Sequence, residues 1–189
     1  MLALKWWKQV LLHEHVERFN FKTTLEVVDL FCDARGTPPR AAAVYVAKGR
    51  ICYTDWEPTS AVLKRLQFRK DEQIMAQELL AVVLGLHTFL PLLQGRLVRI
   101  WEDNKGVEGA LRKGSAIAND HNLIVHSVWL LAARMGMALW IERVPSHDNI
   151  ADDPSRENYD LLKALGAVYW EPVVPREVWE PDAWESVAL

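Results

Sequence analysis

The stretch from Val144 to Arg156, which reads V-P-S-H-D-N-I-A-D-D-P-S-R, holds a dense group of residues that could do chemistry. Asp152 and Asp153 are adjacent carboxylates at the point where a polar loop gives way to helical spacing. Such a pair has an ordinary explanation, because the positive end of a helix dipole favours negative charge. The same pair is also suited to binding a cation, and residues elsewhere in the chain bear on the choice.

Three more carboxylates lie where a predicted sheet would bring them to one edge. Asp33 and Asp103 each follow an apolar, β-prone run, and Glu78 lies among leucines and valines on a predicted helix. An acid beside an apolar stripe is also a common boundary residue. Four carboxylates converging at one edge would repel one another strongly unless cations neutralise them. Oxygen ligands without cysteine or paired histidine select hard ions, magnesium or manganese.

Hydrophobic periodicity predicts an α/β fold. Strands are expected over residues 25–32, 41–47, 50–54, 97–101 and 138–144, and helices over 4–19, 72–93 and 121–135, with a short helix ending near 111 and another after 151. The first three strands form an antiparallel meander, whereas the last two each follow a helix and should be parallel. This order predicts a five-stranded mixed sheet flanked by helices. Ligands of open α/β sheets bind at the carboxyl ends of the strands, where Asp33, Asp103 and the 152/153 pair fall.

The composition predicts one globular domain with a sizeable core, since the chain has 189 residues and is 50% apolar. Its net charge of −3 neither indicates nor excludes nucleic-acid binding, because local charge sets that contact. No apolar run is long enough to span a bilayer, so no membrane partner is expected. Cys32 and Cys52 lie in strand-like runs and are expected to be buried thiols in a reducing, intracellular compartment, the cytoplasm or the nucleus.

The closing segment Asn149-Ile-Ala-Asp152-Asp-Pro-Ser-Arg156, together with the ordered acids, resembles the ribonuclease H family. It is similar to the N-x-x-A-D-x-[LP]-S-R ending of the ribonuclease H domains in retroelement reverse transcriptases, and the Pro-Ser-Arg form is most like the tyrosine-recombinase type. The resemblance implies an RNase H-like fold. The expected organisation is a leading helix over 1–22, an RNase H-like domain over 23–165 and a Trp-, Pro- and acid-rich C-terminal arm over 166–189.

The resemblance implies a metal-dependent endonuclease that hydrolyses the RNA strand of RNA–DNA hybrids. Its catalytic, metal-binding acids would be Asp33, Glu78, Asp103 and Asp152, with Asp153 as the alternate fourth acid. Asp152 is preferred because Ala151-Asp152 takes the place of the motif's A-D pair. Two Mg²⁺ ions, for which Mn²⁺ could substitute, would activate the attacking water and stabilise the leaving 3′ oxygen.

The implied substrate contacts come from a basic cluster and from the residues after the third acid. They are Lys64, Arg65, Arg69, Lys70, Asn104 and Lys105. The basic cluster is equally compatible with a solvated loop. His147 lies in the loop where the family often carries a catalytic histidine, and it is either a proton shuttle or an ordinary loop histidine. Arg35 and the Pro38-Pro39 pair depart from the family's usual first loop, which predicts altered substrate binding.

Several features favour a rival function, a non-catalytic RNase H-like structural or interaction module of a larger assembly. The sequence includes no polymerase domain, so the resemblance implies a separated part of a reverse transcriptase or a domesticated derivative. The acidic arm carries Trp170, Trp179 and Trp184, which are costly to expose to water. The arm is therefore expected to pack on its own domain or to dock on a partner, such as a polymerase domain or another protein. A DNA-cutting nuclease of the same fold fits the closing motif less well.

Overall fold

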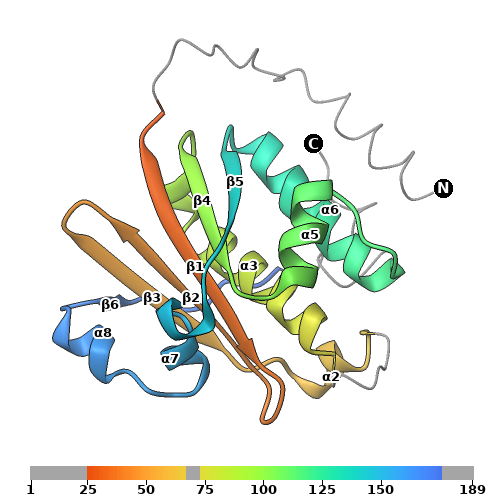
Figure 1. Ribbon diagram of the computed structural model, residues 1–189, viewed down its shortest axis with the longest axis horizontal. Helices are drawn as coiled ribbons and strands as arrows, with labels where there is room; N and C mark the ends of the chain where they lie inside the picture. Colours follow the sequence, from red (N-terminus) through yellow and green to blue (C-terminus); the bar gives the residue numbers. More distant parts are fainter. Residues whose placement is uncertain (1–24, 67–72, 176–189) are drawn as a thin grey trace.

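In the computed structural model, residues 25–66 and 73–175 are described, and they form a six-stranded mixed sheet with helices on both faces (Figure 1). The strands are β1 (Val27–Arg35), β2 (Arg40–Ala47), β3 (Arg50–Trp56), β4 (Leu97–Glu102), β5 (Ala138–Arg143) and β6 (Val168–Tyr169). Their order across the sheet is β5-β4-β1-β2-β3-β6. The predicted α/β class and mixed sheet are confirmed, but the prediction of five strands is wrong. The additional strand, β6, pairs with β3 over only two residues, which is too short to leave a periodic pattern in the sequence.

Strand β1 lies in the middle of the sheet and extends further than its apolar run indicates. It pairs antiparallel with β2 and parallel with β4. The sequence predicts a strand over 25–32, whereas β1 continues to Arg35 and places Asp33 opposite Ala42 of β2. The ladder with β2 supplies the hydrogen bonds that extend β1 beyond its apolar residues. The first candidate acid is therefore held by the sheet and not by a loop.

The helices differ from the sequence expectation mainly where two predicted helices are each divided. They are α2 (Ser60–Leu63), α3 (Ile74–Thr88), α4 (Leu90–Leu93), α5 (Lys105–Lys113), α6 (Asn119–Arg134), the 3₁₀ helix η1 (Ser146–Asp148), α7 (Asp152–Ser155) and α8 (Asp160–Ala164). Pro91 has no amide hydrogen to continue α3, so the helix predicted over 72–93 becomes α3 and α4. Glu157, at φ 63°, separates α7 from α8. Within the described ranges, none of these helices combines the length and apolar character that crossing a bilayer requires.

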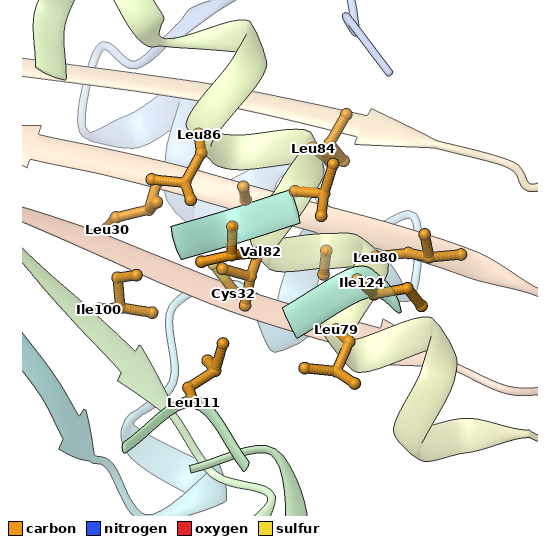
Figure 2. Packing of buried hydrophobic residues seen from close by; sticks show 14 of the residues in the cluster. Leu30, Cys32, Leu79, Leu80, Val82, Leu84, Leu86, Ile100, Leu111 and Ile124 are labelled. Atoms are coloured by element: carbon orange, nitrogen blue, oxygen red, sulfur yellow. The ribbon is translucent and has the colours of Figure 1, made fainter. Parts of the chain in front are cut away.

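The main hydrophobic cluster lies between the sheet and helices α3, α5 and α6 (Figure 2). Leu30 and Cys32 of β1 face this cluster, because alternate side chains of a strand point to the same face. On the other face, α7 and α8 cover a smaller cluster of Val44, Ala151 and Leu162. Figure 1 shows these two short helices on the side of the sheet away from α3. Strands β1 and β2 are thus packed between two helical layers.

The chain after α8 packs against the rest of the domain as far as it is described. Trp170 lies edge-to-face against Phe89, with ring centroids 5.8 Å apart. Further along, the N–H of Val173 donates to Thr88 Oγ1 at 2.9 Å. The first part of the predicted arm therefore lies beside β3 and the end of α3. The rest of that arm, 176–189, and the predicted leading helix lie outside the described residues.

At Gly85, α3 approaches the sheet too closely to admit a side chain. A Cβ atom there would lie 2.9 Å from Ala43 Cβ and 3.0 Å from Leu30 Cδ1. Because Ala43 Cβ moves only with its strand, Gly85→Ala should lower the free energy of unfolding by roughly 1–3 kcal/mol, the usual cost of overpacking. Urea denaturation measures this change.

Gly109→Ala is the matched control for that substitution. Gly109 lies in α5, where an added Cβ atom would meet nothing within 4 Å. Alanine favours a helix over glycine by up to about 1 kcal/mol, so this variant should be at least as stable as the parent. Equal stability of the two variants would contradict the close packing of α3 on the sheet.

Candidate metal centre

Asp33, Glu78 and Asp103 form an acidic cluster at one edge of the sheet. Each offers one carboxylate oxygen, and these atoms all lie within 4.8 Å of one another. Asp33 and Glu78 are almost fully buried, with 4% and 5% of their surface exposed. Glu78, in the second turn of α3, accepts a hydrogen bond from the backbone of Ala34. The fold thus brings together three of the four acids that the sequence predicts as ligands.

The parallel pairing of β1 with β4 places two of these acids side by side. Phe31 pairs with Trp101, and Asp33 and Asp103 each come two residues further along the chain. Asp33 is still within β1, whereas Asp103 is the first residue after β4. The register of one strand pair therefore brings these two candidate ligands to the same end of the two strands.

The fourth predicted acid, Asp152, begins α7 and is ion-paired. Arg156 Nε and Nη2 each donate to its carboxylate at 2.8 Å. The charge of Asp152 acts on Asp33 and on Glu78, which shows that it lies near the cluster. Its oxygens are not among the carboxylate oxygens that lie within 4.8 Å of one another. Joining the other three acids at one cation would require Asp152 to move or to loosen its bond to Arg156.

A buried asparagine attaches α7 to the central strand. The side-chain amide of Asn149 donates to the Cys32 carbonyl at 2.8 Å, and its side-chain oxygen accepts from the N–H of Ala151 at 3.2 Å. These bonds hold the start of α7 beside β1. Asp152 is the first residue of α7, so the same bonds position Asp152 near the acidic cluster. The alternate acid, Asp153, is half-buried and accepts a hydrogen bond from the side-chain amide of Asn158 at 3.1 Å.

Burial and mutual repulsion keep two carboxyl groups protonated well above their usual range. Burial, reinforced by the charge of Asp103, raises the pKa of Asp33 to about 7, although the Ser155 hydroxyl lowers it. Burial, followed by the charge of Asp33, raises the pKa of Glu78 to about 9. A cation held by these carboxylates would act in the opposite direction, because it favours the ionised form.

Glu102, the last residue of β4, is a further buried acid that motif reasoning did not identify. Its side chain is 0% exposed, and neither carboxylate oxygen has a hydrogen-bond partner within the described part of the chain. Burial and the charge of Glu78 raise its pKa well above the usual range. The available signal was its position: Glu102 follows Val98 and Ile100 at intervals of two, so alternation places it on the buried face of β4.

The chemistry of this cluster fits a divalent cation. All three ligand groups are carboxylates, and Glu78 Oε2 is buried without a hydrogen-bond partner among residues 25–66 and 73–175. Buried like charges this close together destabilise the fold unless a cation neutralises them. Oxygen ligands select hard ions, so Mg²⁺ or Mn²⁺ is the expected occupant.

Two predicted substrate contacts lie at the start of α5, directly after the cluster. Asn104 caps this helix, because its Oδ1 accepts from the N–H groups of Gly106 and Val107 at 2.9 and 3.3 Å. Lys105 is exposed at the first position of the helix. Asn104 therefore has a structural role, whereas Lys105 is free to reach a ligand at the edge of the sheet.

The other predicted contacts are exposed or lie outside the described residues. His147 has 80% of its side chain exposed, and its Nε2 atom lies 3.4 Å from Asp148 Oδ2. The first two residues of the basic cluster follow α2 and are exposed: Lys64 and Arg65. The last two lie outside the described residues: Arg69 and Lys70. No contact of His147, Lys64 or Arg65 with the acidic cluster is seen among the described residues.

The unusual first loop is held by arginines that bond to the end of α7. Arg35 and Arg40 donate to the two carboxylate oxygens of Glu157 at 2.9 and 3.0 Å. Arg35 also donates to the Pro38 carbonyl at 2.9 Å. The residues that depart from the family's usual loop thus connect the β1–β2 turn to α7.

Comparisons with known proteins find similarity only at the level of structure. No protein-family model matches the sequence, and no curated protein matches it. The N-terminal RNase H domain of rv2228c from Mycobacterium tuberculosis, solved as a fusion with maltose-binding protein, has 18% identity and a TM-score of 0.48, covering 75% of this chain and 96% of that chain. RNase H1 from the halophilic archaeon Halobacterium salinarum NRC-1 has 14% identity and a TM-score of 0.47, covering 70% of this chain and 97% of that chain.

The raised pKa values of Asp33 and Glu78 predict that the metal-free protein loses stability as pH rises. Both acids ionise near pH 4 in the unfolded chain, whereas the folded protein holds these protons until about pH 7 and about pH 9. The folded state therefore binds more protons between these limits, and the free energy of unfolding falls with pH there. Urea denaturation in a chelator from pH 5 to pH 9 measures the slope.

Two variants make this measurement specific. Asp33→Asn removes one of the raised groups and should flatten the fall in stability, whereas Asp148→Asn changes an acid with 61% of its side chain exposed and should not. Added Mg²⁺ should stabilise the parent more as pH rises, because it binds the ionised carboxylates. An unchanged slope in Asp33→Asn would refute the assignment of the pH dependence to this cluster.

Proposed function

We propose that this chain is a metal-dependent nuclease of the ribonuclease H type that hydrolyses the RNA strand of RNA–DNA hybrids. The observation that carries the proposal is the convergence of Asp33, Glu78 and Asp103 within 4.8 Å at an edge of the sheet. A protein without a cation at this place would gain nothing from burying groups that repel one another. The order of these acids along the chain and the closing motif narrow the activity to the ribonuclease H type.

The carboxylates of Asp33, Glu78 and Asp103 would hold the cations, with Asp152 as the fourth ligand. Divalent ions bound there would supply charge neutralisation at the scissile phosphate and activation of a water nucleophile. Arg156 neutralises Asp152 through its two 2.8 Å hydrogen bonds. Cations would repel this guanidinium, and the released Asp152 would then be available as a ligand.

Substrate recognition would depend on exposed cations around the acidic cluster. Lys105 lies two residues after Asp103, and its exposed side chain is suited to contact a phosphate. Lys64, Arg65, Arg69 and Lys70 would contact the backbone further from the cleavage point. A hybrid would be distinguished from duplex DNA by its shape and by the 2′-hydroxyl groups of the RNA strand. His147 would act as a proton shuttle only if the loop carried it toward the cluster.

We infer an origin in a retroelement reverse transcriptase from the closing motif, in which Asp152 and Arg156 have the spacing of that family's D-x-[LP]-S-R ending, whereas Asn149 lies one residue closer to the Ala-Asp pair than in that ending. The chain would then act as the ribonuclease H part of such an enzyme or as a domesticated derivative inside the cell. A polymerase domain, or another protein bound through the C-terminal arm, would be its partner.

Cleavage of a labelled RNA–DNA hybrid in Mg²⁺ or Mn²⁺ tests the activity. The parent should cut the RNA strand only, and Asp103→Asn should lower the rate by at least about a hundredfold, the scale of losing one transition-state stabiliser. Asp148→Asn, an exposed acid outside the cluster, should cut at the parental rate. A folded parent that cuts nothing with either ion would refute the nuclease and favour the non-catalytic module.

A matched pair of substitutions identifies the fourth ligand. Asp152→Asn should lower the cleavage rate and weaken Mn²⁺ binding measured by calorimetry, because it removes a carboxylate beside the cluster. Its ion pair with Arg156 is largely exposed and is worth at most about 1 kcal/mol, so the fold should persist. Asp153→Asn should leave both properties nearly unchanged. The reverse pattern would assign the role to Asp153.

A further inference from the structure

Strands β5, β4 and β1 form an open sheet face on the side opposite α3. Alternation and register place nine side chains on this face in three rows: Val27, Leu97 and Ala138; Asp29, Arg99 and Trp140; Phe31, Trp101 and Glu142. Val27 and Trp140 have 51% and 58% of their surface exposed. Among the described helices, α3, α5 and α6 pack on the main cluster, and α7 and α8 cover the Val44 cluster, which Phe31 borders at one end of the face.

The charged groups of the open sheet face have partners on the face and, for Glu142, also in α5, where Arg112 Nη2 lies 3.7 Å from its carboxylate. Asp29 accepts hydrogen bonds from Arg99 Nε at 2.5 Å and from Trp101 Nε1 at 2.7 Å. Glu142 accepts a hydrogen bond from Trp140 Nε1 at 2.6 Å. Because these polar groups already have partners, an apolar surface could cover the face without leaving a charge unpaired.

The aromatic geometry favours a protein segment over a nucleic acid as the covering partner. Trp101 stacks on Phe31, with ring centroids 5.7 Å apart and planes 10° apart. The guanidinium of Arg99 lies over the Trp101 ring, 5.0 Å from its centroid. A single-strand binding site needs a free ring face on which a base can stack, and the Trp101 ring already has Phe31 and Arg99 packed against it.

We propose that residues 4–19 of this chain pack as an amphipathic helix on the open sheet face. This segment is joined to β1 through residues 20–26, and the first residue of β1, Val27, is a corner of the face. Its apolar residues have helical spacing: Trp7, Leu11, Leu12 and Val16. The proposal is independent of the nuclease function.

The dimensions and the covalent connection support this occupant. A helix over 4–19 is about 24 Å long, at about 1.5 Å per residue. Three neighbouring strands span about 10 Å between their outer axes, so one such helix crosses the whole face. The seven residues 20–26 can extend over about 23 Å, which is enough to return the helix onto the sheet. A tethered segment also competes at high effective concentration against any separate partner.

Thiol labelling of Ala138→Cys in the full chain tests the docking. Ala138 lies in the same row as Val27, and the native thiols Cys32 and Cys52 are 0% exposed and should not react in the folded protein. The introduced thiol should react slowly. Leu11→Asp should raise the labelling rate roughly tenfold, because the helix would leave the face.

His13→Asp is the matched control, because two residues along a helix turn the side chain by about 200° and place it away from the face that carries Leu11. This variant should leave the labelling rate unchanged. Hydrogen exchange of residues 138–143 in the same two N-terminal variants, without the cysteine, gives a second measurement. It should rise only with Leu11→Asp.

Three outcomes would overturn the proposal. Rapid labelling of Ala138→Cys in the otherwise unchanged chain would mean that the face is open. Slow labelling that Leu11→Asp does not accelerate would mean that something other than residues 4–19 covers it. Protection that increases with protein concentration would assign the face to a second copy of the chain.

Discussion

The parallel hydrogen bonding between β1 and β4 is the constraint on which both distinctive surfaces of this protein depend. With Phe31 opposite Trp101, the acids two residues further along fall side by side at the end of the strands. The residues two and four positions before these acids build the aromatic and ion-paired rows of the open sheet face. A slip of one residue in this register would break the alignment of the two acids and of the rows before them. One register therefore aligns the candidate metal centre and the surface that leads up to it.

The hydrophobic cluster on the α3 side holds that register against electrostatic repulsion. Leu30 and Cys32 of β1, with Val98 and Ile100 of β4, are fully buried against the helices. Burying such side chains contributes about 1.5–3 kcal/mol each, which can offset the cost of bringing carboxylates together. The same burial raises the pKa values of Asp33, Glu78 and Glu102. Apolar packing thus stabilises the fold at this edge, whereas repulsion between the carboxylates destabilises it. A bound cation would neutralise the carboxylates and remove that repulsion.

The loop and short helix after β5 complete the site by a different kind of interaction. Asn149 ties the start of α7 to the backbone of β1, and Arg156 supplies the positive charge nearest to Asp152. Arg35 and Arg40 attach the end of the same helix to the β1–β2 turn through Glu157. These contacts are hydrogen bonds and ion pairs with specified geometry, which fix α7 more narrowly than apolar packing would. A helix of four residues needs such anchors, since it has little stability of its own.

Much of the fold and the membership of the acidic cluster could be predicted from the sequence, because both depend on local patterns. Alternating apolar runs located β1 to β5, and acids at the ends of two of those runs identified Asp33 and Asp103. Glu78 was predicted from its helix and from the resemblance. The division of the predicted helices at Pro91 and Glu157 was missed, since apolar spacing continues across both positions and outweighed the backbone signals.

The amino-acid sequence by itself determined which residue types were available and the order of the strands, helices and acidic residues along the chain. Only the tertiary structure decided that β6 adds to β3 and that Asp152 is bound by Arg156 beside the cluster. It also left the Glu102 carboxylate without a hydrogen-bond partner among the described residues. It also decided that one face of β5, β4 and β1 remains open among the described residues. Each of these features depends on contacts between segments far apart in the chain. Local periodicity carries no record of such contacts, because the same pattern is compatible with several arrangements in space.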